Sequence, residues 1–321
     1  MKNIIFGAYH KDDVIRMDSS SGGVFSAIAI EIINKEGYIF GANLRTDNNI
    51  YSCEHIMCTS VQELEKLRGS KYVPSKIGDT FKQIEKLLKE DKYILFCGTP
   101  CQVAGLISYL GKKYEKLYTI DFICHGVPIP YLLKKVIGED NNKKVISAVD
   151  FRNKKQGWQN YAFSVEYTDG LKSYQLGRES KYMQLYLSDM YLRPSCYTCN
   201  YRSTNRFSDI TLGDFWGVES FKNITNEDMF KGISVVVINS EKGLQIFHKS
   251  SNQLVCFESD ISVFDSTNRY YKEHVIRPYD IKKFRNLIYK QKCDEIINKY
   301  KRYSWFREFV KKVKRKIYKI I

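Results

Sequence analysis

Short apolar runs alternate along the chain with segments whose apolar residues recur at helical spacing. The segments 77–90 and 100–110 predict amphipathic helices, because their apolar residues return every three or four positions. Ser60 followed by Glu63 forms a capping box, which predicts a short helix over 61–67. The runs that predict strands are IIFGAY (4–9), GYIFGAN (37–43), KYILFC (92–97), LYTIDFIC (117–124) and ISVVVINS (233–240).

The order of these elements predicts a fold class. Strand, helix and strand over 92–124 form a βαβ unit, and the nearly all-apolar strands suit a sheet covered on both faces. Residues 145–176 alternate instead as paired antiparallel strands do. We therefore predict an α/β fold with α+β elements: a mixed sheet with βαβ units covered by helices, plus a C-terminal helical tail. The predicted parts are 1–90, 91–265 and a basic helical tail over 266–321.

Composition adds limits on the class of protein. The 321 residues are 43% apolar and 14% aromatic, enough for a sizeable core and unlike a disordered chain. The apolar stretch in MKNIIFGAYHKDD is too short for a signal peptide, and no segment reaches the roughly 20 apolar residues of a membrane span. We therefore expect a cytoplasmic protein whose nine cysteines are free, metal-bound or catalytic.

The net charge of +15 is concentrated at the C-terminus. Residues 301–321 hold nine Lys or Arg and one Glu, so more than half of the excess positive charge lies in this segment. Because the charge is not spread over the rest of the chain, we do not expect the protein to bind nucleic acid. In the same segment apolar residues recur every four positions, from Trp305 and Phe309 to Ile321. Such a helix can lie on the inner face of an anionic membrane, or it can dock its apolar stripe on the body of the protein.

The cysteines divide into two groups by local sequence. Cys196 and Cys199 form the only Cys-x-x-Cys pair, which is half of a four-ligand metal site. Cys101 and Cys124 each follow a predicted strand in a Gly- and Pro-containing turn, so parallel strands would bring them to one sheet edge. Cys101 also begins a helix, which favours its thiolate. These four thiols are predicted to converge, and by count alone they suit a 4Fe-4S cluster or zinc equally.

The other cysteines are expected to be structural, because they lie in apolar or strand-like contexts. We expect buried, inert thiols at Cys53, Cys58, Cys97, Cys256 and Cys293.

A second candidate site surrounds a glycine-rich turn. Ser19, Ser20 and Ser21 with Gly22 and Gly23 precede a helical pattern, a sequence that suits phosphate oxygens or simply caps the helix. The segments GSKYVPS and FRNKKQGW add cations and rings that could contact a phosphate or a flavin ring, or could equally be surface ion pairs and core aromatics. Their candidate residues are Lys71, Tyr72, Arg152, Lys154 and Trp158.

Two acidic residues flank the short strand-like run DITLGD. Asp209 and Asp214 are expected either to orient Arg202 or Arg206 near the cysteines or to close a turn.

Taken together, several motifs make the chain resemble one protein family. The chain is similar to the family of coenzyme F-420 hydrogenase/dehydrogenase beta subunits from about residue 5 to about residue 220. The motifs, in the family's order, are SSSGGVFS, RGSKYVPSKIGDTF, GTPCQVAGL, DFICHGVP, FRNKKQGW and CYTCNYRSTNRFSDITLGDFWG.

The resemblance implies an iron–sulfur flavoprotein oxidoreductase that passes electrons between a 4Fe-4S cluster and a flavin, with FAD more expected than FMN. By motif it assigns Cys101, Cys124, Cys196 and Cys199 to the cluster and makes residues 1–90 the flavin-binding part. The substrate would be an unknown molecule, glycan-related or a deazaflavin. Members of the family are associated with deazaflavin reduction, formate dehydrogenases, chlorophyll-type substrates and surface-polysaccharide gene clusters.

The chain departs from many bacterial members in one respect. It begins close to FGAYHKDDVIRMDSSSGG and has no C-x-x-C-x-x-C run, which those members carry in a ferredoxin-like segment. A separate ferredoxin-like donor or a partner subunit is therefore expected to deliver electrons. The alternative is a non-catalytic, metal-stapled scaffold of a membrane-associated polysaccharide biosynthesis machinery.

Overall fold

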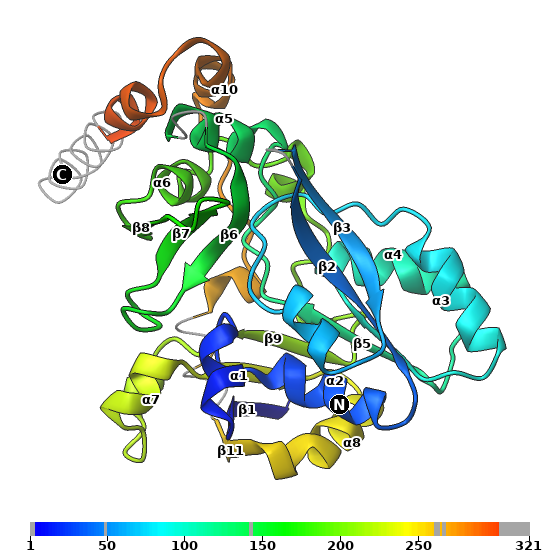
Figure 1. Ribbon diagram of the computed structural model, residues 1–321. Helices are drawn as coiled ribbons and strands as arrows, with labels where there is room; N and C mark the ends of the chain where they lie inside the picture. Colours follow the sequence, from blue (N-terminus) through cyan, green and yellow to red (C-terminus); the bar gives the residue numbers. More distant parts are fainter. Residues whose placement is uncertain (1–3, 48–49, 141–143, 260–263, 265–267, 302–321) are drawn as a thin grey trace, which may run out of the picture.

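An eight-stranded mixed sheet forms the centre of the protein (Figure 1). The computed structural model describes residues 4–47, 50–140, 144–259, 264 and 268–301. The sheet order is β11-β1-β10-β9-β5-β4-β2-β3. Its strands are β1 (Ile4–His10), β2 (Tyr38–Asp47), β3 (Ile50–Cys58), β4 (Ile94–Cys97), β5 (Leu117–Phe122), β9 (Ile210–Asp214), β10 (Ser234–Ile238) and β11 (Leu254–Glu258).

The middle of this sheet is parallel and its two sides are antiparallel. Strands β2, β4, β5 and β9 run parallel in register, with Ile94 opposite Leu117 and Ile120 opposite Ile210. The predicted βαβ unit is confirmed as β4, helix α4 (Pro100–Leu110) and β5. Thr99 caps α4 in a capping box with Gln102, and Pro100 occupies the first helical turn.

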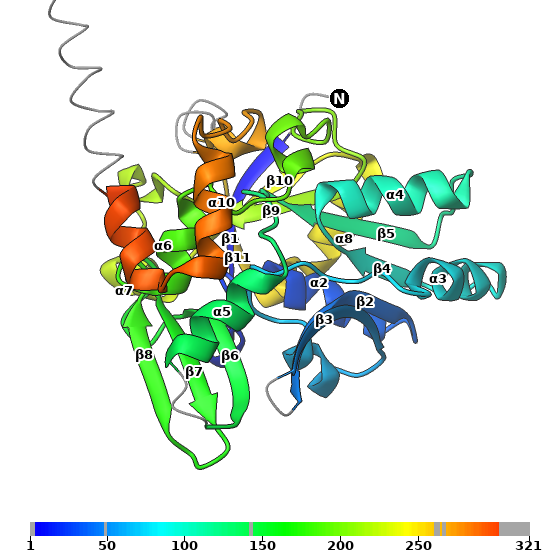
Figure 2. The ribbon, with the colours of Figure 1, turned by 90° about the horizontal axis from the view of Figure 1, so that it is seen from above.

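Both faces of the large sheet are covered, as the apolar strands predict. Successive residues of β4 point to opposite faces, so Leu95 packs with one cluster while Ile94 and Phe96 pack with another. Helices α2 (Val24–Ile33) and α8 (Glu241–Lys249) cover the first face. Helices α3 (Thr80–Lys89) and α4 cover the second face beside β4 and β5 (Figures 1 and 2).

A smaller antiparallel sheet confirms the strand-like alternation of residues 145–176. Strands β6 (Ile146–Asn153), β7 (Ala162–Tyr167) and β8 (Lys172–Leu176) lie on the side of the molecule away from α3 and α4 (Figures 1 and 2). Their apolar residues share the largest core cluster with four helices. These helices are α5 (Tyr131–Asp140), α6 (Lys181–Leu187), α10 (Ile281–Lys290) and the helix over 293–301.

The remaining elements are short. The helix expected after the capping box is a 3-10 helix, Gln62–Lys66. The hydroxyl of Ser60 accepts a hydrogen bond from the backbone N–H of Glu63 at 3.4 Å. The carboxylate of Glu63 accepts one from the backbone N–H of Thr59 at 2.9 Å. The helical tail predicted over 266–321 is confirmed at α10 and over 293–301, and residues 302–321 lie outside the described chain. The others are α1 (Asp13–Asp18), α7 (Asn226–Lys231), η2 (Pro194–Thr198), η3 (Val218–Ser220), η4 (Ser250–Gln253) and η5 (Arg269–Tyr271).

Candidate functional site

The cysteine-bearing turns lie where β4 and β5 end. Cys101 sits in the first turn of α4, directly after β4, and is exposed. Cys124 follows β5, which pairs with β4 in parallel, so both turns leave the same edge of the sheet. Cys196 lies in η2 and Cys199 directly follows it. The parallel strands on which the split-site prediction depends are therefore present.

The thiols of the three segments lie within one another's electrostatic range. The pKa of Cys124 is raised to about 12, chiefly by burial and further by Cys101 and Cys196. The pKa of Cys196 is raised by burial, with Cys199 and Cys101 contributing. In the parts of the chain that the structure describes, no group of three or more His, Cys, Asp or Glu is gathered closely enough to hold a metal ion as it stands.

The backbone around Cys124 is fixed from several directions. Tyr186 donates its hydroxyl to the carbonyl of Gly126 at 3.0 Å, and Arg202 donates to the carbonyl of His125. The backbone N–H of Val127 donates to the Cys196 sulfur at 3.4 Å, which ties the second turn to the third segment. Arg202 also favours the ionised form of Cys124 electrostatically. A cation and a backbone donor beside the thiols suit an anionic, thiolate-bound group.

The glycine-rich turn packs tightly against the sheet. A side chain on Gly22 would come within 2.4 Å of the carbonyl oxygen of Ala8, so only glycine fits there. Gly23 has a φ of 87° and is the N-cap of α2, without a side-chain cap. Ser21 donates its hydroxyl to the carbonyl of Ile233 at 2.7 Å. The Ser21–Gly22 part of the turn is thus held by internal bonds.

A cavity of about 250 Å³ opens beside this turn. It is lined by Asp18, Glu65, residues 68–71, Val149 and Asp150, and Ser70 shares a 2.8 Å hydrogen bond with Ser20. The volume is just below the roughly 300–1,000 Å³ of small-molecule sites, so it suits part of a cofactor. Of the predicted flavin residues, Lys71 lines this cavity directly and Ser20 is joined to its wall.

Two cations of the cavity come from one segment. Burial lowers the pKa of Lys71 to about 8, and its Nζ donates to the carbonyl of Arg68 at 2.5 Å. Arg68 donates from Nε to the hydroxyl of Ser26 in the first turn of α2 at 3.1 Å. The sequence motifs pointed to Lys71 and not to Arg68, although both lie in the RGSKY segment. The signal for Arg68 is a second cation three positions before Lys71.

Arg152 lies in a second polar site at the end of β9. Its Nη1 donates to Asp214 at 2.9 Å and contacts the hydroxyl of Tyr72 at 3.4 Å, and its guanidinium carbon lies 4.2 Å from the centre of the Tyr161 ring. Burial alone would lower the pKa of Arg152, but Asp214 and the tyrosines outweigh it and raise that pKa. The Nε and Nη2 of Arg152 are buried and have no hydrogen-bond partner in the described part of the chain. Unsatisfied buried donors of this kind fit a ligand with acceptor atoms.

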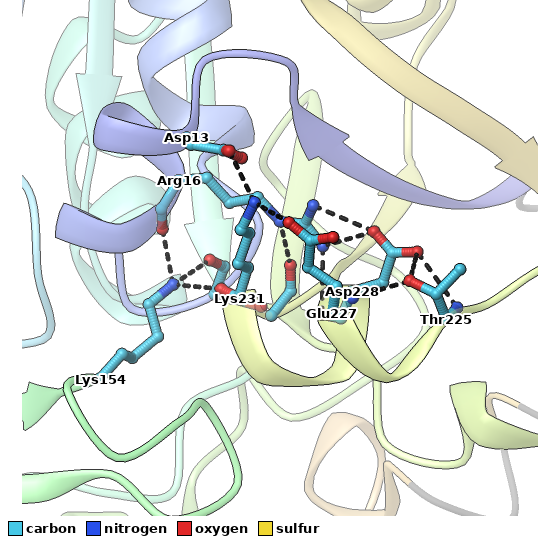
Figure 3. A network of polar contacts seen from close by, with 9 residues as sticks. Asp13, Arg16, Lys154, Thr225, Glu227, Asp228 and Lys231 are labelled. Atoms are coloured by element: carbon cyan, nitrogen blue, oxygen red, sulfur yellow. Dashed lines mark hydrogen bonds and ion pairs between the residues drawn. The ribbon is translucent and has the colours of Figure 1, made fainter.

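Lys154 is bonded internally (Figure 3). Its Nζ donates to the carbonyls of Arg16, Ser21 and Lys231 at 2.5, 2.8 and 2.6 Å, and burial lowers its pKa to about 7. These three contacts join the segment after β6 to α1, to the glycine-rich turn and to α7. Lys154 therefore stabilises the glycine-rich turn by linking it to α1 and α7.

Trp158 is fully buried and is also bonded internally. Its ring stacks on Trp216 with centroids 5.0 Å apart, and its Nε1 donates to Asp214 at 2.8 Å. Lys154 and Trp158, like Ser21 and Gly22, are thus residues predicted to contact a flavin whose polar groups are bonded within the protein.

The expected pairing of Asp209 or Asp214 with the arginines of the 202–206 segment is wrong. Asp209 instead accepts from Thr119 at 2.8 and 2.9 Å, and Asp214 binds Arg152 and Trp158. Arg206 pairs with Asp121, at 3.6 Å between Nη1 and Oδ2. Asp121 lies on β5, inside a predicted apolar strand, which explains why the sequence did not indicate this partner.

The structural cysteines are buried with one exception. Cys53, Cys58 and Cys293 are buried as predicted, and Cys97 is partly buried at the end of β4. Cys256 is exposed, contrary to prediction, because β11 is an edge strand of the large sheet. Among the described residues no helix is long and apolar enough to span a membrane.

Comparisons with known proteins agree with the family resemblance. Residues 5–82 match the model for the N-terminal region of the coenzyme F420 hydrogenase/dehydrogenase beta subunit, and residues 91–263 match the model for its C terminus. The chain is 27% identical over 261 residues to one subunit of the F(420)H(2) dehydrogenase of Methanosarcina mazei, covering 76% of this chain and 67% of that protein.

A solved structure shares the fold. A chain of the F420-reducing [NiFe] hydrogenase complex from Methanosarcina barkeri superposes with a TM-score of 0.54 at 16% identity, covering 96% of this chain and 92% of that one. Together the two family models match well over half of the sequence. The chain therefore belongs to the family of coenzyme F420 hydrogenase/dehydrogenase beta subunits, whose members are iron–sulfur flavoprotein oxidoreductases.

Proposed function

We propose that this protein passes electrons between a 4Fe-4S cluster and FAD, and that a partner protein and a small-molecule substrate complete the path. The observation that carries this proposal is the combination of two features in one chain. Cys124 and Cys196 each lie within electrostatic range of Cys101 and of Arg202, and Cys199 lies within range of Cys196. Arg152 separately keeps two buried donors that no described residue accepts from.

The cluster would be held by Cys101, Cys124, Cys196 and Cys199. Burial raises the pKa of Cys124 to about 12, so binding of iron must displace its proton, and Arg202 stabilises the resulting thiolate. The N–H bond from Val127 to Cys196 would persist as a bond to a ligand sulfur. Cys101 is exposed, which leaves this side of the site open to a partner protein.

The flavin would be held by Ser20, the Gly23 helix start, Lys71, Tyr72 and Arg152. The start of α2 offers N–H groups to phosphate oxygens, with Lys71 as a nearby cation. Lys154, Ser21 and Gly22 would hold the turn from behind through their bonds within the protein, and Trp158 would hold Asp214. When bound, the flavin supplies two-electron chemistry and the cluster one-electron transfer.

The substrate and partner are proposed from the relatives. One relative is named as part of an F(420)H(2) dehydrogenase, which supports a deazaflavin as the candidate substrate. The structural relative comes from a hydrogenase complex, which supports a partner subunit as the electron donor or acceptor.

Anaerobic purification with iron, sulfide and flavin analysis tests this function. We expect about four iron atoms and one flavin per chain. A colourless protein with one zinc per chain would refute the redox proposal and favour the metal-stapled scaffold.

The flavin site is tested by charge reversal of one cation. Lys71→Glu should lower flavin occupancy while iron content stays unchanged, because the new carboxylate would repel a phosphate. Lys76→Glu is the matched control, since Lys76 is exposed in the same segment. Equal flavin occupancy in the two variants would contradict the placement of the flavin beside Lys71.

A further inference from the structure

The guanidinium of Arg152 is bonded on one side only. Nη1 contacts Asp214 and Tyr72, while Nε and Nη2 are buried and have no hydrogen-bond partner among the residues that the structure describes. These two nitrogens form the side-on edge of the guanidinium, where two N–H bonds run parallel. Such an edge matches a planar ligand that offers two neighbouring acceptors.

Asp214 determines where that edge points. Its Oδ2 accepts from Arg152 at 2.9 Å and its Oδ1 accepts from Trp158 at 2.8 Å, so both carboxylate oxygens are engaged. Trp158 cannot move easily, because it is fully buried and stacks on Trp216 with an interplanar angle of 6°. The carboxylate is therefore held between a fixed indole and the guanidinium.

The surroundings of Arg152 distinguish a flavin ring from a phosphate. Asp214 offsets the charge of the guanidinium, the ring of Tyr161 lies against it, and the hydroxyl of Tyr72 contacts it. A nearly neutral, aromatic site suits an uncharged planar edge better than a phosphate dianion. Arg68 and Lys71 line the cavity beside α2 and donate to Ser26 and to a backbone carbonyl, and Asp150 lies near Lys71 in the same cavity.

We propose that Asp214, clamped by Trp158, is a positioning residue that directs the Nε–Nη2 edge of Arg152 at the pyrimidinedione edge of the flavin ring. This inference rests on the proposed flavin site. The positive edge stabilises negative charge on that part of the ring, which grows when the flavin is reduced. Arg152 therefore raises the affinity for reduced flavin more than for oxidised flavin.

Riboflavin separates ring recognition from phosphate recognition, because it has the ring and no phosphate. We would load the full chain with its cluster, remove the flavin, and measure Kd for riboflavin and FAD by fluorescence quenching. Arg152→Gln should weaken both ligands by the same factor, about tenfold to a hundredfold, the usual effect of a hydrogen bond to a charged group. Lys71→Glu should weaken FAD only.

Asp214→Asn should weaken both ligands in the wild-type background and have no further effect in Arg152→Gln. Asp209→Asn is the matched control, because Asp209 is a similarly buried carboxylate at the other end of β9 and contacts Thr119 instead. It should leave both Kd values within about twofold of wild type. If Arg152→Gln does not fold, Arg152→Lys keeps the charge without the parallel edge and should still weaken riboflavin and FAD equally.

The flavin potential supplies a readout that a purely structural role would not move. A tenfold greater loss of affinity for reduced than for oxidised flavin in Arg152→Gln lowers the two-electron potential by about 30 mV.

Three results would overturn the proposal. Weaker FAD with unchanged riboflavin in Arg152→Gln would place Arg152 on the phosphate. Independent, multiplicative effects of the Asp214 and Arg152 variants would remove the positioning role, and an unchanged potential would remove the ring contact. A wild-type protein that binds neither ligand would instead refute the proposed function itself.

Discussion

The ion pair between Arg16 and Asp228 should be one of the strongest single contributions to stability in this fold. Arg16 donates from Nη1 and Nη2 to Asp228 Oδ1 at 3.1 and 3.2 Å, and from Nε to the carbonyl of Gly232 at 2.9 Å (Figure 3). Its side chain is 3% exposed, and its guanidinium lies 3.7 Å from the centre of the Tyr9 ring. The pair joins α1 to α7.

We expect Arg16→Met to lower the free energy of unfolding by about 3–5 kcal/mol. The change leaves a carboxylate with 12% exposure without its cation, and it leaves the carbonyl of Gly232 without the donor that Arg16 supplies. Burial lowers the pKa of Arg16, so the isolated cation is unfavourable as well, and the stability depends on the two partners together. Arg16→Met with Asp228→Asn should therefore cost less than the sum of the single changes.

Urea unfolding of the four proteins in this double-mutant cycle measures the effect. Arg178→Met is the matched control, because Arg178 forms an exposed ion pair with Glu179 at 3.8 Å, a kind worth about 0–1 kcal/mol. If Arg16→Met costs no more than Arg178→Met, or if the two single changes are additive, the buried pair does not hold α1 to α7 in the way described.

Three further predictions concern other parts of the chain. Burial raises the pKa of Asp121 to about 6, above its value in the unfolded chain, so the folded state loses stability as Asp121 ionises with rising pH. Between pH 5 and pH 7, urea unfolding should show the free energy of unfolding of wild type falling by about 1 kcal/mol more than that of Asp121→Asn. An equal fall in the two proteins would contradict the raised pKa. Elemental analysis should find that Cys196→Ser has lost most of its iron, whereas Cys256→Ser, changed on the edge strand β11, should keep its iron. Equal iron content in the two variants would exclude Cys196 as a ligand. Deletion of residues 302–321 should release the protein from anionic vesicles in a flotation assay, since each cation contributes about 1 kcal/mol at such a surface. The contrary result is a full-length protein that does not bind vesicles and a truncated protein that unfolds. It would indicate a helix that docks on the body of the protein.

The sequence by itself determined the parts of this protein that depend on neighbouring residues. The apolar runs and the Gly-Thr-Pro-Cys turn predicted β4, α4 and β5 closely, and the period-two alternation predicted the second sheet. The turn containing Gly22 was recognisable as a helix start, although its tight packing on Ala8 was not. Strand and helix periods, caps and turn residues are local, so they can be read within a few positions.

The tertiary structure decided which polar side chains meet. Arg152 and Asp214 are 62 positions apart, and the sequence had offered for Asp214 only a contact with Arg202 or Arg206 or a role in closing a turn. Arg206 pairs with Asp121 from β5 instead, and the exposure of Cys256 follows from the edge position of β11. Such contacts depend on strand order and on the packing of one sheet beside another, which the residues on either side of each partner do not encode.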